Sequence, residues 1–153
     1  MVEKIKTTAP GAAEVAGFTH EAIDSAPLLA TAAGAGDGAV ATFIGVVRDN
    51  QNGRAVRYLG YEAHETMALA HMERLVVEAQ RRWAIGRALI RHRLGEVQIG
   101  DVSVVVVVAA SHRAEAMDAC RWLIDTLKRE VPIFKKEHFA DGEASWVGEG
   151  ELK

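Results

Sequence analysis

Two lysines near the C-terminal end of the sequence, Lys128 and Lys135, lie on either side of a proline that is expected to end a helix. Lys128 belongs to the last turn of a predicted helix, which Pro132 stops because the residue before a proline is pushed out of the α region. Lys135 then lies on a short strand. Each lysine has an ordinary structural interpretation, since the helix dipole favours a cation at its C-terminus and lysines often protect sheet edges. The alternative is acid–base or anion-binding chemistry by the pair.

The strand that carries Lys135 has two different faces, because successive residues of a strand point to opposite sides. Lys135 and Glu137 share one face. Phe134, Lys136 and His138 share the other. The sequence does not show which face is the functional one.

Ser111, His112 and Arg113 lie where a strand made almost entirely of valine passes into a helix. We predict that Ser111 caps this helix. A helix N-terminus offers free N–H groups and a positive dipole end, and a guanidinium binds phosphate in a bidentate manner, so His112 and Arg113 are candidates for an anion site. The alternative is that both are solvated residues of the first turn, although a cation there opposes the helix dipole.

Three other patterns have better structural explanations. The glycines in Gly34–Ala39 match the letters of a dinucleotide fingerprint, but they follow a helix and precede a strand, the reverse of the order that motif requires, and a helix-to-strand connection is favoured. His64 and His71 are seven residues apart and do not have zincin spacing, so no metal site is predicted. Cys120 lies on an apolar helix face and is expected to be a small buried hydrophobe.

The composition indicates one globular domain. The 153 residues are 49% hydrophobic and carry a net charge of −3, so no overall field attracts nucleic acid or an anionic membrane. A single cysteine cannot form an internal disulfide and no secretory signal is evident, which favours the cytoplasm. The apolar run Val104–Ala110 is far shorter than the roughly 20 residues of a membrane-spanning helix. We expect a flexible N-terminal tail over 1–17 and a single domain over 18–153.

The order of predicted elements is typical of an α+β fold with mostly antiparallel strands. A β-hairpin is expected from Ala39–Arg48 and Val56–Tyr61, with turn-forming residues between them. The buried face of the last helix is predicted to contain Met117, Cys120, Ile124 and Leu127. The remaining expected strands are Phe18–Ile23, Ala88–Leu94, Val102–Ala110, Ile133–Phe139 and Ser145–Val147, and the other expected helices run from Ser25 through Ala33 and from Thr66 to near Gly86.

Four ordered blocks make the chain resemble the molybdopterin synthase large (catalytic) subunit family from about Gly38 to Val147. The blocks are Thr42–Arg48, His92–Glu96, Ala110–Arg113 and Leu127–Glu137. The resemblance implies an α/β-hammerhead-type fold and a homodimer. Each protomer would bind a small ubiquitin-like sulfur-carrier subunit ending in Gly-Gly, which gives a heterotetramer.

The resemblance also implies the reaction, in which cyclic pyranopterin monophosphate becomes molybdopterin by receiving two sulfurs from the partner's C-terminal thiocarboxylate. No metal or other cofactor is then required. Lys128 and Lys135 would be catalytic, with Lys128 handling protons and Lys135 stabilising an oxyanion, or the reverse. The implied substrate-binding residues are Phe43, Val46, Val47, Arg48, His112, Arg113, Lys136 and Glu137.

The sequence departs from the family in two places. The position of Val46 is often a lysine in relatives, and the end of the chain after Trp146 is short and acidic. Both changes reduce the positive charge available to the substrate. Two other functions remain open: a module that only docks a ubiquitin-like protein, and a phosphoester-handling enzyme that uses His112 and Arg113 without a partner.

Overall fold

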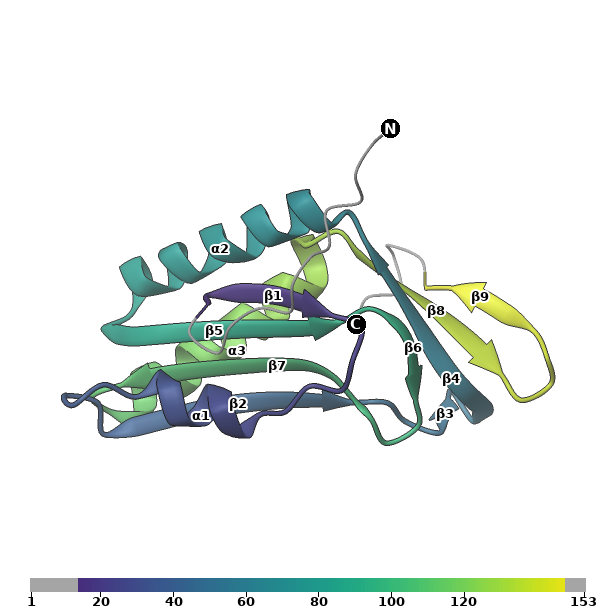
Figure 1. The fold of residues 1–153 in the computed structure, drawn as a ribbon, viewed down its shortest axis with the longest axis horizontal. Coiled ribbons are helices and arrows are strands. Elements are labelled where there is room, and N and C mark those ends of the chain that lie inside the picture. The colour runs from purple at the N-terminus through teal and green to yellow at the C-terminus, as the bar shows by residue number, and fades with distance from the viewer. Residues whose placement is uncertain (1–13, 148–153) are drawn as a thin grey trace.

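The computed structural model describes residues 14–147 and contains two β-sheets with three helices (Figure 1). One sheet has four strands in the order β1-β5-β7-β2 and is called the larger sheet below, because its strands contain more residues than the five strands of the other sheet. β1 is parallel to β5, and the other neighbours are antiparallel. The strands are β1 (Ala16–Thr19), β5 (Ile85–Arg93), β7 (Val102–Ala110) and β2 (Ala39–Val46).

The smaller sheet lies beyond one end of the larger one, at the right in Figure 1. Its main order is β3-β4-β8-β9, and β6 also pairs with β4. Within residues 14–147 no strand pairing joins the two sheets. Its strands are β3 (Asn50–Gln51), β4 (Arg54–Ala63), β6 (Gly95–Gln98), β8 (Ile133–Phe139) and β9 (Ala144–Trp146).

Helices cover both faces of the larger sheet. α2 (Glu65–Arg82) and α3 (Arg113–Glu130) pack on one face, against a core that contains Ile90, Val106 and Val108. α1 (Ala26–Ala32) packs on the other face, against Leu89, Val105 and Val107. Burial on both faces explains the continuous valine run of β7, because a strand covered on both sides has no polar face. No helix in this part of the chain is long and apolar enough to cross a membrane.

The predicted hairpin between Ala39–Arg48 and Val56–Tyr61 is wrong. β2 pairs with β7, while β4 belongs to the other sheet and pairs with β6 and β8. The turn residues do close a hairpin, but a much shorter one between β3 and β4, with Asn52 and Gly53 both at positive φ. The local turn signal was correct, and the pairing of the long strands was decided by tertiary packing.

Other boundaries also differ from the sequence prediction. β1 begins at Ala16, so the last two residues of the expected tail 1–17 belong to the larger sheet, and residues 1–13 lie outside the described part. β6 was not predicted. Met117 is 62% exposed, so it does not share the buried face of α3. The buried stripe is centred on Ala116, Ala119 and Leu123, and Met117 falls outside it.

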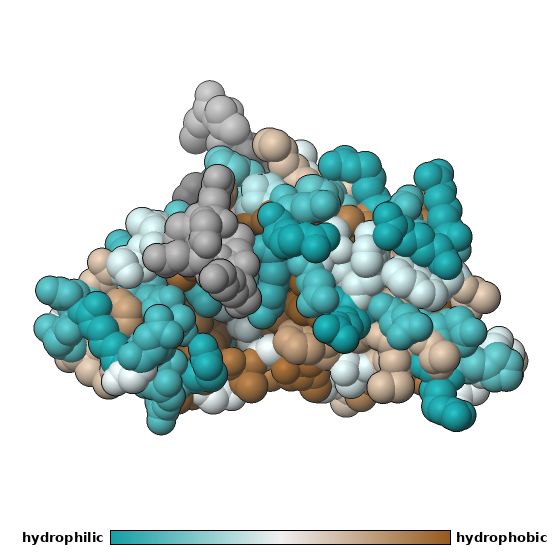
Figure 2. All heavy atoms as spheres, turned by 180° about the vertical axis from the view of Figure 1, so that it is seen from behind, coloured by the Kyte–Doolittle hydropathy of each residue, from teal (hydrophilic) through white to brown (hydrophobic). Residues whose placement is uncertain are grey.

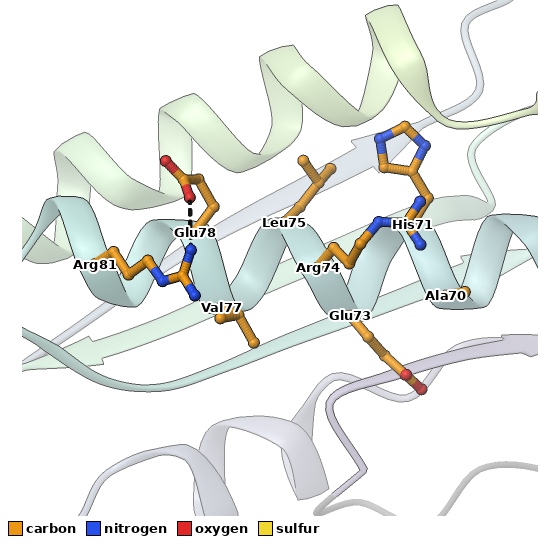
Figure 3. Close-up of a pocket in the computed structure, with 8 residues that line it drawn as sticks. All are labelled: Ala70, His71, Glu73, Arg74, Leu75, Val77, Glu78 and Arg81. Atoms are coloured by element: carbon orange, nitrogen blue, oxygen red, sulfur yellow. Dashed lines mark ion pairs between the residues drawn. The ribbon is translucent and has the colours of Figure 1, made fainter.

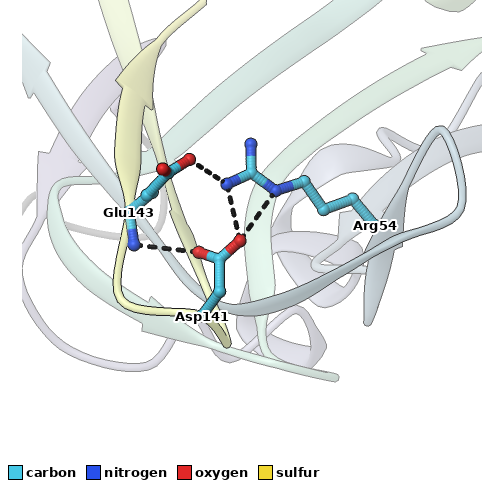
Figure 4. Close-up of polar contacts among 3 residues, drawn as sticks. All are labelled: Arg54, Asp141 and Glu143. Carbon is cyan, nitrogen blue, oxygen red and sulfur yellow. Dashed lines mark hydrogen bonds and ion pairs between the residues drawn. The ribbon is translucent and has the colours of Figure 1, made fainter.

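Arg54 ties the β3–β4 turn to the β8–β9 turn (Figure 4). Its Nη2 donates to Oδ2 of Asp141 at 2.8 Å and also to Glu143, and its guanidinium carbon lies 3.7 Å from the centre of the Phe139 ring. The backbone N–H of Glu143 and the Arg54 guanidinium hold the pKa of Asp141 below its usual value. Because these charges are exposed to solvent, the cluster orients the two turns more than it stabilises the fold.

Truncation of Leu123 is expected to destabilise the protein strongly, because this side chain is fully buried between α3 and the larger sheet. Leu123→Ala should lower the free energy of unfolding by about 2–5 kcal/mol in a urea titration. Met117→Ala on the same helix is the matched control and should change it by less than about 0.5 kcal/mol. Equal effects of the two substitutions would contradict this description of the core.

Candidate active site

Lys128 lies in the last turn of α3, and its Nζ is 5.7 Å from the centre of the Phe43 ring. Phe43 belongs to β2 and is partly buried against the core beneath α3. A lysine at this distance from an aromatic face is attracted by the ring electrons. The predicted position of Lys128 at the end of the helix is confirmed, and Phe43 forms one wall beside it.

Lys135 on β8 points towards the same region, on the face that it shares with Glu137. Glu137 is only 7% exposed, so this face is turned inward. Burial lowers the pKa of Lys135 below its usual value, and the positive charges of Lys128 and Arg48 lower it further, whereas Glu137 opposes the shift. The inner face of β8 therefore carries the lysine that lies within electrostatic range of Lys128 and Arg48.

Arg48 is held on a loop that continues β2. The backbone N–H of Val47 donates to the carbonyl of Asp101, and the N–H of Gly100 donates to the carbonyl of Val47, which fixes the loop against the β6–β7 connection. Nη2 of Arg48 donates to Oε1 of Gln51 at 2.9 Å, leaving the guanidinium exposed. Val47 is buried and serves the packing of this loop, while Val46 is 54% exposed at the end of β2.

His112 and Arg113 lie at the opposite end of α3 from Lys128. Fifteen helical steps from residue 113 to residue 128 correspond to about 22 Å. His112 is the N-cap, without a side-chain cap, and the Oγ of Ser111 donates to the carbonyl of Gly36 at 3.3 Å, so the predicted capping role of Ser111 is wrong. Within this chain, the predicted anion site and the lysines are not brought together.

Lys136 lies on the other face of β8. Its Nζ is 5.4 Å from the centre of the Trp146 ring on β9. The alternation of β8 thus separates Lys136 from the inward-facing pair Lys135 and Glu137. Of the residues implied by the resemblance, the chain brings together Phe43, Arg48, Lys128, Lys135 and Glu137.

Two residues near the lysines, Tyr61 and His92, were not predicted from the sequence as part of the site. Their rings make an edge-on contact with centroids 4.9 Å apart. Burial lowers the pKa of His92 to about 4, and the nearby charge of Lys128 contributes to the shift. The only signal available from the sequence was that His92 begins the family block His92–Glu96.

A shallow depression on the outer side of α2 is separate from this cluster (Figure 3). It is lined by His71, Arg74, Glu78 and neighbouring residues of that helix, and none of the predicted site residues contributes to it. Glu78 pairs with Arg82 at 3.0 Å and with Arg81 at 3.8 Å. His71 lies 3.3 Å from Glu130 of α3. These contacts are those of a solvated helix face.

Comparison with known proteins identifies the family. The sequence model of the MoaE protein family matches residues 18–130. The chain belongs to the MoaE protein family. The molybdopterin synthase catalytic subunit of Nostoc sp. is 44% identical over 115 residues, which are 74% of this chain and 70% of that protein.

Solved structures agree with this membership. Molybdopterin synthase from Staphylococcus aureus has a TM-score of 0.81 at 32% identity, and the match covers 86% of this chain and 95% of that chain. A chain from Helicobacter pylori, described as part of a complex of subunits 1 and 2 of molybdopterin-converting factor, has a TM-score of 0.72 at 23% identity over 89% and 92% of the two chains, which shows a shared fold. The α+β fold and the molybdopterin synthase function predicted from the resemblance are confirmed: the chain is a sulfur-transfer enzyme of molybdenum cofactor biosynthesis.

The buried His92 predicts a specific dependence of stability on pH. Burial lowers the pKa of His92 to about 4 in the folded chain, from the usual 6.5 of a histidine side chain, so between these two pH values the unfolded chain binds one proton more than the folded chain. The free energy of unfolding should be fully retained above about pH 6.5 and should decrease by up to about 3 kcal/mol as the pH falls to 4. Urea titrations across this range would measure the slope.

His92→Gln should flatten that slope, because glutamine does not titrate. His20→Gln, at an exposed histidine, is the matched control and should leave it unchanged. An identical slope in the wild type and in His92→Gln would contradict the buried neutral state of His92.

Proposed function

We propose that Lys128, Lys135 and Arg48 of one protomer and His112 and Arg113 of a second protomer form one molybdopterin synthase active site. The substrate is cyclic pyranopterin monophosphate, and the sulfur comes from the C-terminal thiocarboxylate of a small ubiquitin-like subunit. The observation that carries the proposal is the convergence of Lys128 and Lys135 from different elements, close enough that their charges interact. The chemistry proposed needs no metal or cofactor, because the partner supplies the sulfur.

The proposed reaction places negative charge where the cations lie. The thiocarboxylate sulfur attacks an electrophilic carbon of the pterin and displaces the oxygen bound to that carbon, either as the phosphate oxygen of the cyclic phosphate or as water, and so forms a thioester. Water then adds to the thioester carbonyl and breaks its C–S bond, which leaves a thiolate on the pterin and a carboxylate on the partner. A second thiocarboxylate repeats these steps at the other carbon. The tetrahedral intermediate of that hydrolysis carries an oxyanion, and opening of the cyclic phosphate adds a second negative charge on phosphate oxygen. Fixed cations stabilise such charges most effectively in a partly buried site.

The environment of Lys135 favours a role in proton transfer for this lysine and a role in oxyanion stabilisation for Lys128. A lysine with a lowered pKa has a larger neutral fraction near neutral pH and can accept a proton. Lys128 is exposed at the end of its helix and lies against the Phe43 ring. We assign proton transfer to Lys135 and stabilisation of the oxyanion to Lys128.

A second copy of the chain would complete the site through β2. This strand is an edge of the larger sheet, and Val40, Ile44 and Val46 on its uncovered side are 40–54% exposed. Seen from behind, hydrophobic residues gather along the lower edge of the molecule, where β2 lies in Figure 1 (Figure 2). An exposed apolar edge strand is suited to pairing with another chain.

Antiparallel pairing of two β2 strands about a twofold axis would also bring the two half-sites together. The start of α3 adjoins the start of β2, because the N–H of Gly38 donates to the carbonyl of Ala110. The end of α3 adjoins Phe43, nearer the other end of β2. A twofold axis places the start of one strand beside the end of its copy, so Arg113 of the second copy would approach Lys128.

The small subunit is part of the same proposal. With one such subunit on each protomer, the assembly would be a heterotetramer, in line with the complex of subunits 1 and 2 described for the similarly folded Helicobacter pylori protein. We place the enzyme in the cytoplasm, where the single buried Cys120 would remain a thiol.

Removal of either lysine should abolish synthesis without unfolding the chain. Lys128→Ala or Lys135→Ala should reduce the rate of molybdopterin formation with a thiocarboxylated partner by at least about 100-fold, because proton transfer or oxyanion stabilisation is lost. Arg129→Ala, at the exposed cation next to Lys128, is the control and should retain the wild-type rate. Circular dichroism checks the fold, and full activity in both lysine variants would refute the site.

Mixed dimers test whether the site is shared. Lys128→Ala and Arg113→Ala homodimers should each be inactive, but dimers with one chain of each kind would contain one intact site. Random mixing makes half of the dimers mixed, so activity should recover to about a quarter of the wild-type value. Mixing Lys128→Ala with Lys135→Ala should give no recovery, because both lysines of a site are proposed to come from the same chain. Recovery in this mixture would mean that the two lysines come from different chains.

A further inference from the structure

The two lysines lie on parts of the molecule that no strand pairing joins within the described residues. Lys128 belongs to α3, which packs on the larger sheet, whereas Lys135 belongs to β8 of the smaller sheet. The chain between them turns at Val131, where α3 ends, and Pro132. The placement of Lys135 relative to Lys128 therefore depends on side chains that pack between the two sheets.

Tyr61 is directly connected to the position of Lys135. These two residues are cross-strand partners in the antiparallel pair of β4 and β8. Side chains of such partners stand on the same face of a sheet, with their Cβ atoms about 5 Å apart. On its other side, Tyr61 pairs with Gly95 of β6, so its strand is held from both sides. Any movement of the Tyr61 ring against the larger sheet would move Lys135 with it.

The other side of this contact is His92, at the end of β5 in the larger sheet. The Tyr61 and His92 rings meet at an interplanar angle of 69°, with centroids 4.9 Å apart. Nδ1 of His92 lies 2.7 Å from the carbonyl oxygen of Arg93 and must donate to it, since a carbonyl can only accept, which fixes the ring orientation. Phe18 packs near the same imidazole at 6.4 Å. His92 is thus a buried, immobile surface for Tyr61.

A second contact reinforces this junction between the sheets. The Tyr61 hydroxyl interacts with Ser103 of β7. Ser103 is 6% exposed, and its Oγ donates to the carbonyl of Gly45 on β2 at 3.3 Å. One side chain of the smaller sheet therefore reaches β5 through its ring and β7 through its hydroxyl.

We propose that Tyr61 is a positioning residue, whose ring packs on His92 and holds Lys135 at its working distance from Lys128. This inference rests on the proposed active site. Tyr61 acts through Lys135 and makes no contact of its own with the reacting atoms. It belongs to the inner surface of the smaller sheet, a part of the site that the sequence motifs do not include.

Replacement of the ring tests this role. Tyr61→Leu should lower kcat by about 10- to 100-fold, because a displacement on the order of 1 Å suffices for such a loss, while KM changes less than about twofold. Tyr61→Phe keeps the ring and should retain at least about half of the wild-type kcat. Tyr58→Leu is the matched control, since Tyr58 lies on the opposite face of the same strand, stacked on His138 at 4.2 Å, and it should leave kcat unchanged.

The pH profile separates positioning from general destabilisation. If Lys135 leaves its buried position and moves away from Lys128 and Arg48, burial and these two charges no longer lower its pKa to the same extent, so the rise of kcat with pH should shift to higher pH in Tyr61→Leu. Tyr61 and His92 are both neutral in this range, so such a shift cannot come from a deleted charge. His92→Asn removes the other ring and keeps a donor for the Arg93 carbonyl. It should give the same shift, and it provides the test if Tyr61→Leu does not fold.

Several results would overturn the proposal: an unchanged kcat in a folded Tyr61→Leu or His92→Asn variant, a loss of kcat with an unshifted profile, or equal losses in the Phe and Leu variants. The proposed active site and the proposed role of Tyr61 can be refuted separately. Activity in Lys135→Ala would refute the proposed site itself, whereas inactive lysine variants together with unaffected Tyr61 variants would refute only the role of Tyr61.

Discussion

The packing of α3 against β7 and β2 is the contact on which the rest of the site depends. Ala116, Ala119 and Leu123 are fully buried in this contact, and the small alanines let the helix lie close to the sheet. An 18-residue helix held in this way is a rigid spacer of about 27 Å. Apolar burial therefore determines where the charges lie: Lys128 at one end of the helix and Arg113 at the other.

The concentration of positive charge near Lys135 is the second constraint. A partly buried ammonium loses hydration, and nearby cations add repulsion, so both effects favour the neutral amine. Glu137, buried on the same face, moderates the repulsion. The arrangement thus places a lysine with a lowered pKa beside other cationic side chains, which is the combination that proton transfer next to an oxyanion requires.

The residues that could be predicted from the sequence are those whose signal is local. The valine run Val104–Ala110 and the proline after α3 determine elements that form as expected. The alternation of β8 predicted that Lys135 and Lys136 face opposite ways, but only the burial of Glu137 shows which face is turned inward. The partner of β2 could not be predicted, because strand pairing across more than fifty residues depends on the packing of α3 and not on the turn that follows β2.

Tyr61 escaped the sequence analysis for a related reason. Its type and position are ordinary for a strand, and its importance arises only when β4 is placed against β5 of the other sheet. His92 lay within a recognised block, yet nothing local indicated that it is buried and neutral. Contacts between two sheets leave no pattern in the spacing of residues along the sequence, so the residues that make these contacts cannot be predicted from spacing.

The proposed distribution of the cations over two copies of the chain would have a physical advantage. If Arg48, Lys128, Lys135, His112 and Arg113 converged within one protomer, their repulsion would oppose folding of that protomer. In the arrangement proposed, each chain folds with its two clusters about 22 Å apart, beyond the Debye length of about 8 Å at physiological ionic strength. The repulsion arises only on association, where the apolar side chains of β2 offset it and the anionic substrate then neutralises it. In the proposed dimer, the edge strand that would otherwise be a liability for aggregation would become the element that assembles the site.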